Sequence, residues 1–559
     1  MEHIWLEQYP AGVDTHIDVR AFPSLRHMFE DSVVRFPDRT AFISMGARLS
    51  YARLGELAEN FGSYLQNVAK LPRGARVALM APNLLCYPVA LFGALAAGYV
   101  IVNCNPLYTR YELERQLADS GAEAVIVLEK FAGTVAKAIA TTPVRCVIVA
   151  RIGDLLGFPR GVLTNVVARH VKRLIPDWTI PGAIPFMKAL QLGARNPLKA
   201  PELGPDDLAF LQYTGGTTGI PKGAELTHGS VVANVQQGFA WCRPFVEDGR
   251  ETIVTPLPLY HIFALTVSCL LFMRFGATNL LIANPRDLKG FVRELSRCRF
   301  TAISGVNTLF NALLNNEAFR RLDFSAMKIS VSGGMSLQQA VADKWRAVTG
   351  RVLIEGYGLT ECSPCALINP LDLDDFNGAA GLPMPRTAIS IRDESGAEVA
   401  ALEQGELCIK GPQLMRGYWN HPDETAQAFT PDGFLRTGDI VMMDARGYVH
   451  VVDRKKDMIL VSGFNVYPGE VEDVVALHQG VEEVGAVGVA DASTGEAVKI
   501  VVVKRDHGLH ADELIAHCRK YLAGYKIPRH IEFRPDLPKT NLGKILRRAL
   551  RDEHRHKKD

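Results

Sequence analysis

The sequence has almost no net charge and few cysteines for its length. Its 62 lysines and arginines nearly balance 60 aspartates and glutamates, so the formal charge of +2 gives no molecule-wide field for holding nucleic acid. The ten cysteines among 559 residues are scattered, which is typical of core residues in a reducing compartment and not of a disulfide framework. These absences argue against a basic nucleic-acid-binding protein and against a disulfide-stapled secreted domain.

The first residues, MEHIWLEQYP, lack the basic start, apolar stretch and small-residue cleavage site of a secretory signal, so we expect a cytoplasmic protein. The most apolar stretch, 84–102, suggests a membrane span at first sight. Prolines and glycines divide the uncharged stretch around it, between Arg76 and Arg110, into a strand (VALMA), a helix and a second strand (YVIV). We therefore predict a buried parallel β-α-β unit there.

Short β-branched runs alternate with helical patterns from about residue 24 to 439, which predicts stacked α/β sheets with parallel strands. Near 439–456 the pattern changes to short strands around an Asp-Ala-Arg-Gly turn, and a smaller α+β unit follows. In that unit Pro468 can open a helix with Val471, Val474 and Val475 at helical spacing. The fold class is α/β, with a large N-terminal body (1–455) and a small C-terminal domain (456–559).

Residues 213–228 read YTGGTTGIPKGAELTH, a loop that offers backbone N–H groups, hydroxyls and one cation to phosphates. It is not a Walker A loop, because Pro221 precedes Lys222 and Gly223 follows it, and it is not a G-x-G-x-x-G fingerprint. A flexible surface turn is the alternative, but such a turn needs no lysine fixed by a proline. The candidate phosphate-binding residues are Tyr213, Thr214, Gly215, Gly216, Thr217, Thr218, Gly219, Lys222 and Gly223.

Further motifs follow in a fixed order: PLPLYHIFAL (256–265), SGGM (332–335), GYGLTE (356–361), RTGD (436–439), VDRKKDMILVSGFNVYP (452–468) and PKTNLGKILRR (538–548). With this set the chain resembles, over nearly its whole length, the adenylate-forming superfamily of acyl-CoA synthetases, luciferases and nonribosomal adenylation domains. The phrases SGFNVYPGEVEDVV, GYKIP and GKILRR most resemble bacterial long-chain fatty acid–CoA ligases, which feed β-oxidation. The resemblance implies a body that binds ATP and fatty acid and a mobile small domain.

The GYGLTE motif presents Thr360 and Glu361 together, so a hydroxyl can meet the α-phosphate while a carboxylate holds Mg²⁺. The alternative is a solvated glutamate after a strand. The resemblance also implies that Gly333, Gly334 and Tyr357 form a slot in which the adenine lies flat against an aromatic ring. This part of the chain is therefore our candidate adenine and metal site.

Five residues of the body and the small domain take their predicted roles from the resemblance alone. Asp439 and Arg454 are assigned to the ribose of ATP, and Lys456 to the hinge. Gly463 is the side-chain-free position at which CoA approaches the site. Lys544 is the adenylation lysine, which stabilises negative charge between the substrate carboxylate and the α-phosphate. In isolation Lys544 belongs to a charge run that is normally a solvated face.

His261 lies inside an apolar stretch, where a lone histidine is usually a satisfied core residue. The resemblance places it beside the acyl carboxylate, and we keep it as a catalytic-site candidate, adjacent to substrate and not as a general base. Cys362 and Cys365 form a C-x-x-C, but the sequence contains no second ligand pair of matching spacing. We therefore expect neither zinc nor redox work there.

Residues 162–175 form a basic amphipathic pattern, with apolar residues on one side of a helix and Asn165, Arg169, Lys172 and Arg173 on the other. A helix packed on its own domain explains the pattern equally well. We hypothesise reversible peripheral attachment to the inner face of the cytoplasmic membrane, where a lipid-handling enzyme meets its substrate. The apolar residues are Val162, Leu163, Val166, Val167, Val171 and Leu174.

The resemblance predicts an ATP-dependent ligase that converts ATP, a fatty acid and CoA into acyl-CoA, AMP and diphosphate through an acyl-AMP. Expected cofactors and partners are ATP, Mg²⁺, CoA, the fatty acid and an anionic membrane surface, but no nucleic acid; a homodimer is among the open oligomeric states. The alternatives are a medium-chain or aryl acid–CoA ligase, or an acyl-AMP ligase that delivers to a carrier, although no carrier domain precedes Asp559. From another class, a non-catalytic lipid sensor could keep the fold. Acyl selectivity depends on a tunnel shape that the sequence does not define.

Overall fold

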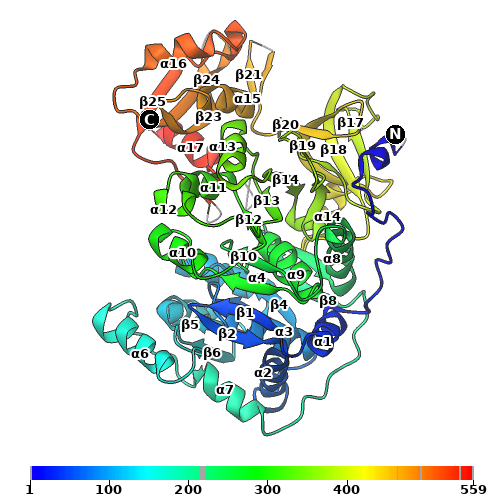
Figure 1. Ribbon diagram of the computed structural model, residues 1–559, viewed down its shortest axis with the longest axis vertical. Coiled ribbons are helices and arrows are strands. Elements are labelled where there is room, and N and C mark those ends of the chain that lie inside the picture. Colours follow the sequence, from blue (N-terminus) through cyan, green and yellow to red (C-terminus); the bar gives the residue numbers. More distant parts are fainter. Residues whose placement is uncertain (1–2, 215–220, 463, 492–493, 541–542, 557–559) are drawn as a thin grey trace.

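The computed structural model describes residues 3–214, 221–462, 464–491, 494–540 and 543–556, and within these ranges the chain forms four β-sheets (Figure 1). Two large sheets and one small sheet belong to the body, and the fourth sheet lies in the small domain at the C-terminal end of the chain. Several predicted site residues lie outside the described residues, namely Gly215, Gly216, Thr217, Thr218, Gly219 and Gly463.

The largest sheet has the strand order β16-β15-β14-β13-β12-β10-β11-β1-β2. Its strands are parallel from β14 to β1, and the edge strands β2, β15 and β16 are antiparallel. The strands are β1 (Thr40–Ser44), β2 (Ala47–Ser50), β10 (Thr252–Thr255), β11 (Thr278–Leu281), β12 (Ala302–Gly305), β13 (Ile329–Gly333), β14 (Ile354–Gly358), β15 (Cys365–Ile368) and β16 (Leu382–Pro383).

The second large sheet has the order β7-β6-β5-β3-β4-β8-β9 and is parallel except for β9. The stretch 84–102 forms the expected unit here, because β3 and β4 are parallel and the fully buried helix α3 (Cys86–Ala96) connects them. No described helix is both long and apolar enough to cross a membrane. The strands are β3 (Arg76–Met80), β4 (Val100–Asn103), β5 (Ala122–Leu128), β6 (Cys146–Ala150), β7 (Ile184–Pro185), β8 (Leu208–Tyr213) and β9 (Gly223–Thr227).

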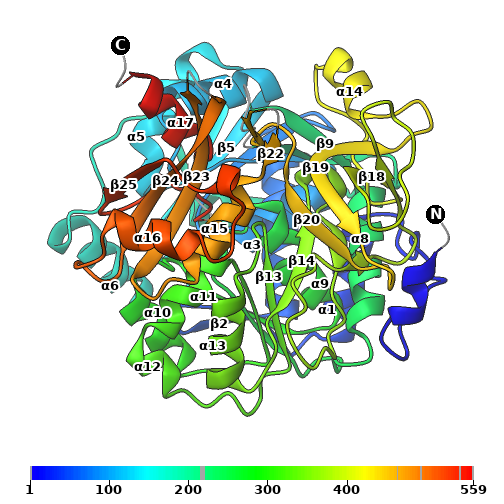
Figure 2. The same cartoon turned by 90° about the horizontal axis from the view of Figure 1, so that it is seen from above.

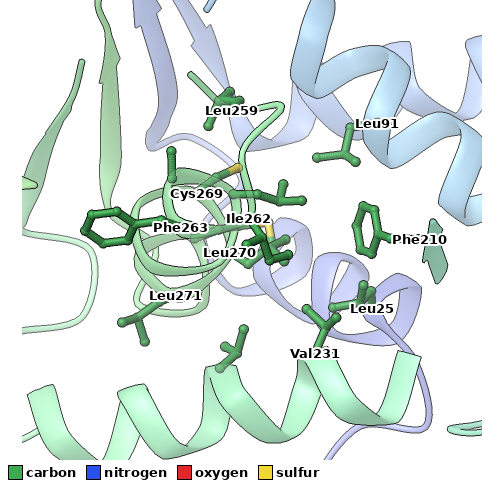
Figure 3. Close-up of a cluster of buried hydrophobic side chains, with 14 of the residues drawn as sticks. Leu25, Leu91, Phe210, Val231, Leu259, Ile262, Phe263, Cys269, Leu270 and Leu271 are labelled. Carbon is green, nitrogen blue, oxygen red and sulfur yellow. The ribbon is translucent and has the colours of Figure 1, made fainter. Parts of the chain in front are cut away.

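A layer of helices separates the two large sheets. The largest hydrophobic cluster contains residues of both sheets together with α1, α2, α3, α8 and α9, so this layer is the main core. Figure 3 shows part of it, where Leu25 of α1, Val231 of α8 and Phe210 of β8 lie on one side of the π-helix η6 (Ala264–Leu270). The helices not yet bounded are α1 (Leu25–Arg35), α2 (Tyr51–Ser63), α8 (His228–Cys242) and α9 (Leu271–Arg274).

Other helices cover the outer faces of the large sheets. A second cluster packs α10, α11, α12 and α13 on the nine-stranded sheet, and a third packs α4 and α5 on the seven-stranded sheet. Side chains fix several helix starts; Thr109, for example, closes a capping box with Glu112 at the start of α4. The helices are α4 (Arg110–Ser120), α5 (Ala132–Ala138), α6 (Arg160–Val166), α7 (Phe186–Gly193), α10 (Leu288–Leu295), α11 (Asn307–Leu314), α12 (Glu317–Arg320), α13 (Gln339–Thr349) and α14 (Pro422–Ala428).

A four-stranded antiparallel sheet completes the body, and the sequence analysis did not anticipate it as a separate unit. Its order is β17-β18-β19-β20, with the Asp-Ala-Arg-Gly turn between the last two strands as expected. The strands are β17 (Ala388–Arg392), β18 (Gln404–Lys410), β19 (Leu435–Met443) and β20 (Val449–Arg454). This sheet leads directly into the small domain.

The small domain is a mixed sheet with helices on both faces (Figure 2). Val471 and Val475 of α15 are buried against the sheet, as their helical spacing indicated. On the opposite face Leu550 of α17 packs against β23 and β24. The elements are β21 (Ile459–Val461), β22 (Phe464–Val466), α15 (Pro468–Ala476), β23 (Val481–Asp491), β24 (Gly495–Lys504), α16 (Ala511–Cys518), β25 (His530–Arg534) and α17 (Arg547–His556).

Candidate active site

The loop that carries Lys222 joins two antiparallel strands of the seven-stranded sheet. Tyr213 at the end of β8 pairs with Gly223 at the start of β9, and the backbone N–H of Thr214 donates to the carbonyl of Lys222 at 2.9 Å. The strand β9 then separates Lys222 from α8. The described part of this loop therefore lies at the end of a β-hairpin, and Lys222 is fixed by strand pairing on its C-terminal side.

Tyr418 connects Lys222 with the metal candidate Glu361. The ammonium of Lys222 lies 4.7 Å from the centroid of the Tyr418 ring, and the Tyr418 hydroxyl donates to Oε1 of Glu361 at 2.7 Å. Burial and the nearby negative charge of Glu361 raise the pKa of Tyr418, so the phenol stays protonated. The sequence analysis missed Tyr418, because an Arg-Gly-Tyr stretch between two loops carries no signal of this contact.

The side chain of Tyr213 is engaged by the neighbouring helix α4. Its hydroxyl donates to the carboxylate of Asp119, whose backbone carbonyl also accepts from the indole N–H of Trp419 at 3.1 Å. A side chain at Gly223 would place its Cβ 3.2 Å from the Tyr213 ring, so the glycine makes room for that ring. Tyr213 and Gly223 therefore determine how the two strand ends at the base of the loop pack.

Gly333 and Gly334 lie where β13 ends, beside the strand that carries Tyr357. Gly333 pairs with Gly356, and a Cβ on Gly333 would lie 3.2 Å from both the Phe263 ring and the Gly356 carbonyl oxygen. Gly334 has a φ of +77°, in the left-handed region that favours glycine. The structure thus brings the predicted adenine-slot residues to neighbouring strand ends.

Tyr357, Asp439 and Arg454 form one hydrogen-bonded group, which we call the ribose cluster. The Tyr357 hydroxyl donates to Oδ2 of Asp439 at 2.6 Å, and Nε of Arg454 lies 2.9 Å from Oδ1. Asp439 and Arg454 are cross-strand partners on β19 and β20, and the Asp439 side chain is only 4% exposed. Burial and the charge of Asp439 raise the pKa of Tyr357. A neutral hydroxyl, a carboxylate and a guanidinium can together contact a ribose.

Thr360 and Glu361 belong to the short turn η7 (Thr360–Cys362), directly after the strand that carries Tyr357. The backbone carbonyl of Glu361 accepts from the N–H of Met415 at 2.7 Å, which fixes the turn to the segment of Tyr418. No group of three or more His, Cys, Asp or Glu among the described residues could hold a metal. A single carboxylate beside phosphate oxygens is nevertheless a common Mg²⁺ arrangement, and Glu361 supplies that donor.

His261 is a neutral imidazole near the same strand ends. Burial lowers its pKa from 6.5 to about 4, and its Nδ1 accepts from the backbone N–H of Phe263 at 3.3 Å. Since the Phe263 ring abuts Gly333, the His261 segment lies against the adenine-slot glycines. Cys362 and Cys365 are thiols whose pKa is raised by burial, that of Cys365 to about 12.

Lys544 reaches this region from the small domain. Gly543 has a φ of +85°, its carbonyl accepts from the Thr308 hydroxyl of α11 at 3.5 Å, and a Cβ there would lie 2.6 Å from Thr308 Oγ1. Burial and the positive charge of Arg454 lower the pKa of Lys544 from 10.5 to about 8. The charges of the ribose cluster therefore act on the Lys544 ammonium, while Lys456 is exposed between β20 and β21.

An apolar cavity lies between α8, η6 and β13, beneath the strand ends that carry the site. Its lining includes Asn234 and Trp241 of α8, Thr266 and Val267 of η6, Val331 of β13 and Cys365 of β15. The cavity measures about 40 Å³, which is room for roughly three water molecules. A longer apolar ligand therefore requires side chains to move apart.

Comparison with known proteins shows that both parts of the chain match family models of AMP-binding enzymes. The family model described as "AMP-binding enzyme" matches residues 29–419, and the one described as "AMP-binding enzyme C-terminal domain" matches residues 470–544. The chain is 54% identical to a long-chain-fatty-acid–CoA ligase of Salmonella typhi over 559 residues, which cover 100% of both chains. It is 36% identical to one of Bacillus subtilis over 552 residues, which cover 98% of each.

Solved structures of lower identity share the arrangement. The chain is similar to ATP-bound MatB from Rhodopseudomonas palustris, with a TM-score of 0.80 and 27% identity, covering 96% of this chain and 100% of that one. It is also similar to a benzoate CoA ligase from Burkholderia xenovorans, with a TM-score of 0.80 and 27% identity, covering 94% and 99%.

Proposed function

Because the chain belongs to the AMP-binding enzyme family and is a long-chain fatty acid–CoA ligase, we propose that its site divides two half-reactions between the body and the small domain. The enzyme uses ATP, Mg²⁺ and CoA to convert a fatty acid into acyl-CoA, with AMP and diphosphate as the other products. The observation that carries the proposed division is the position of Lys544, which comes from the small domain yet lies next to Gly543, whose carbonyl accepts from Thr308 of the body.

In the first half-reaction a carboxylate oxygen of the fatty acid attacks the α-phosphorus of ATP. The new bond is P–O to the acyl group, and the bond to the β-phosphate oxygen breaks, so that diphosphate leaves. Lys544 stabilises the negative charge that builds between carboxylate and α-phosphate, and Thr360 donates to that phosphate. Lys222 steadies the departing phosphates, while Asp439 and Arg454 fix the ribose. The neutral imidazole of His261 lies beside the acyl group without taking a proton.

Mg²⁺ fits the donor set at Glu361, a hard carboxylate oxygen on the turn that follows the Tyr357 strand. When bound there, the ion neutralises phosphate charge. The residues of this chain orient the phosphates: Lys222 from the β8–β9 hairpin and Thr360 from η7. Tyr418 links Glu361 with Lys222: its hydroxyl donates to Glu361, and the Lys222 ammonium lies over its ring.

In the second half-reaction the CoA thiolate attacks the acyl carbon, a C–S bond forms and AMP leaves with the shared oxygen. For this step the small domain (456–559) rotates about Lys456 relative to the body (1–455), which withdraws Lys544 and brings the segment of Gly463 to the site. Lys456 lies exposed between β20 and β21, where the carbonyl of its backbone accepts from Arg551 at 3.4 Å. Lys544 therefore acts in the first step only.

Lys544→Ala tests this division. We expect loss of acyl-AMP formation by about a thousandfold, the scale of a lost electrostatic contact to the transition state. Conversion of supplied acyl-AMP and CoA into acyl-CoA should stay within about twofold of wild type. Both are measured on the same preparation, by diphosphate release without CoA and by thioester formation without ATP. Equal loss of the two half-reactions would contradict the proposal.

We further propose that the acyl chain enters the apolar cavity along α8. The surface of the cavity is apolar. Two of its lining residues on α8, Asn234 and Trp241, are about 10 Å apart along the helix axis. The buried Trp241 donates its indole N–H to the Asn369 carbonyl at 3.2 Å. It also packs edge-on against Tyr9, with 4.8 Å between the ring centroids, and so closes one side of the cavity. A diphosphate-release series over C4 to C18 and aryl acids, repeated on Trp241→Ala, tests this. An unchanged optimum in the variant would count against the location.

The helix α6 and the turn that follows it support peripheral membrane attachment. Val162, Leu163 and Val171 are 58%, 63% and 71% exposed, whereas Gly161 and Ala168 are buried against the body. The helix therefore docks through small residues and turns its apolar side outward, the reverse of an ordinary surface helix. Of the six apolar residues, Val162, Leu163, Val166, Val171 and Leu174 are exposed and do not pack on the body, whereas Val167 is partly buried. In Figure 1 this helix projects at the edge of the body.

The charged residues of this segment have two different roles. Arg169 pairs with the buried carboxylate of Glu129, so its charge is used inside the protein. Lys172 and Arg173 are exposed beside the apolar side and complement an anionic lipid surface. An occupant that is both apolar and anionic fits this face, and a bilayer containing anionic lipid has that chemistry.

A vesicle assay separates the two contributions. We expect the double variant Val162→Ser with Leu163→Ser to lose most sedimentation with phosphatidylglycerol vesicles. Lys172→Glu with Arg173→Glu should lose sedimentation at low salt, and neither should change turnover of a detergent-solubilised substrate. Val34→Ser is the matched control, since Val34 is 77% exposed on α1. Wild-type sedimentation of both double variants would rule out attachment through this helix.

A further inference from the structure

A charged cluster at the hinge has no part in the reaction steps described above. Asp453 is the last residue but one of β20, three residues before Lys456, and its side chain is 3% exposed. Two groups of the small domain reach it: Nη1 of Arg547 lies 2.7 Å from Oδ1, and the backbone N–H of Gly469 donates to Oδ2 at 2.6 Å. Asp453 therefore ties the body to the small domain at two points.

Arg547 opens α17, three residues after Lys544. Its guanidinium grips Glu472 of α15 with two contacts, Nε to Oε1 at 2.9 Å and Nη2 to Oε2 at 2.5 Å. Both residues belong to the small domain, so this pair can move as one piece. The contact with Asp453 crosses the hinge and cannot survive a large rotation about Lys456. One guanidinium thus makes a permanent contact and a conditional one.

The start of α15 shows the same dependence on Asp453. The N-cap residue Tyr467 makes no side-chain hydrogen bond to the first turn, although an orphan backbone N–H normally finds such an acceptor. The carboxylate of Asp453 takes that place from the body and puts negative charge at the positive end of the helix. The cap of a small-domain helix is therefore supplied across the hinge.

We propose that Asp453 and Arg547 form a latch that holds the small domain where Lys544 faces the ribose cluster, and that the latch opens for thioester formation. A contact that exists in only one of two orientations shifts the population toward that orientation. Asp453 and Arg547 are positioning residues, acting on the first half-reaction through Lys544. The inference rests on the division of labour proposed above.

The Arg547 side of the latch keeps its charge at neutral pH. Burial alone would lower the pKa of Arg547, but Glu472 and Asp453 outweigh it and raise that pKa, so the guanidinium stays charged. Arg534 of β25 pairs with Glu553 of α17 at 2.6 Å. Because both residues belong to the small domain and move with it, that pair should not respond to rotation about Lys456. It is the matched control.

Asp453→Asn and Arg547→Gln test the latch through the two half-reactions. We expect diphosphate release without CoA to slow by about tenfold in each, the scale of one lost charge-assisted contact. Thioester formation from supplied acyl-AMP should be unchanged or faster. The double variant should be no slower than Arg547→Gln alone, because both substitutions remove the Asp453–Arg547 contact and Arg547→Gln already removes the contact with Glu472. Arg534→Gln should behave like wild type. Equal slowing of both half-reactions, or additive effects in the double variant, would overturn the latch.

Hydrogen exchange gives a readout that does not depend on turnover. Asp453→Ala should speed exchange in the first turn of α15, which contains the Gly469 amide, while leaving α16 unchanged. Faster exchange throughout the small domain would instead indicate a merely structural role and would overturn the proposal. If Lys544→Ala itself fails to separate the half-reactions, the proposed function is at fault. If Lys544→Ala separates them but the Asp453 and Arg547 variants do not, only the latch is wrong.

Discussion

The ribose cluster and Lys544 face each other but are held by different means. Tyr357, Asp439 and Arg454 lie on strands of the body and are fixed by strand pairing and by hydrogen bonds of 2.6 and 2.9 Å. Lys544 lies on a turn of the small domain, and the contact recorded between that turn and the body is the 3.5 Å hydrogen bond from Thr308 to Gly543. The proposed nucleotide end of the site is therefore preformed, whereas the position of Lys544, the proposed catalytic charge, depends on the position of the small domain.

Asp439→Asn should have the largest effect, because it breaks the preformed side. It leaves the Arg454 guanidinium without its carboxylate partner in a buried setting, and disruptions of this kind cost about 3–5 kcal/mol. We expect kcat/KM to fall by at least about a hundredfold in both half-reactions, since the AMP moiety is present in both. A loss confined to acyl-AMP formation would erase the proposed difference between cluster and lysine. A thermal unfolding curve checks that the variant remains folded.

The pH profile should separate the two sides next. Burial and the charge of Arg454 lower the pKa of Lys544 to about 8, with Arg547 lowering it further and Asp439 and Asp457 opposing. The ammonium is therefore charged below about pH 8 and loses its proton above it. We expect kcat/KM for acyl-AMP formation to fall about tenfold per unit above that pH.

Thioester formation from supplied acyl-AMP should lack this fall. Lys544→Arg provides the control, because a guanidinium keeps its charge throughout the range and should flatten the decline in whatever activity remains. A decline of the same steepness in Lys544→Arg, or in both half-reactions of the wild type, would show that another group is titrating.

Tyr357→Phe should give the smallest effect and sharpen the description of the cluster. The ring stays in the adenine slot, and one hydrogen bond to Asp439 is lost, which corresponds to about 1 kcal/mol. We expect KM for ATP to rise about fivefold with kcat nearly unchanged. A large fall in kcat instead would mean that the hydroxyl contributes to the chemistry and not only to the placement of Asp439.

The large sheets and the order of the site motifs could be predicted from the sequence, because β-branched runs and glycine-rich turns are local signals. Contacts between distant side chains could not. The hydrogen bond from the Tyr418 hydroxyl to Glu361 joins positions 57 residues apart, and the Arg547–Asp453 ion pair joins positions 94 residues apart. Nothing in either neighbourhood names its partner. Arg547 looked like one more charge in a solvated basic run.

The amphipathic segment at 162–175 shows a different limit. Periodicity predicted one helix over 162–175 with an apolar and a polar side, but the helical segment ends at Val171, so Lys172 and Arg173 lie beyond it. The pattern also could not tell which side faces the body. The answer came from Gly161 and Ala168, whose small size lets the helix approach the body closely while the valines and leucine point outward. A pattern defines two faces, and only packing decides which of them is the inside.

Adjacent residues of β20 serve two neighbours. Successive side chains of a strand point to opposite faces, so Arg454 meets Asp439 on one side while Asp453 meets Arg547 on the other. The nucleotide contact and the grip on the small domain are thus separated by a single peptide unit. A tilt of this unit that accompanies departure of AMP would move both side chains together. The end of β20 can therefore couple occupancy of the nucleotide site to the position of the small domain.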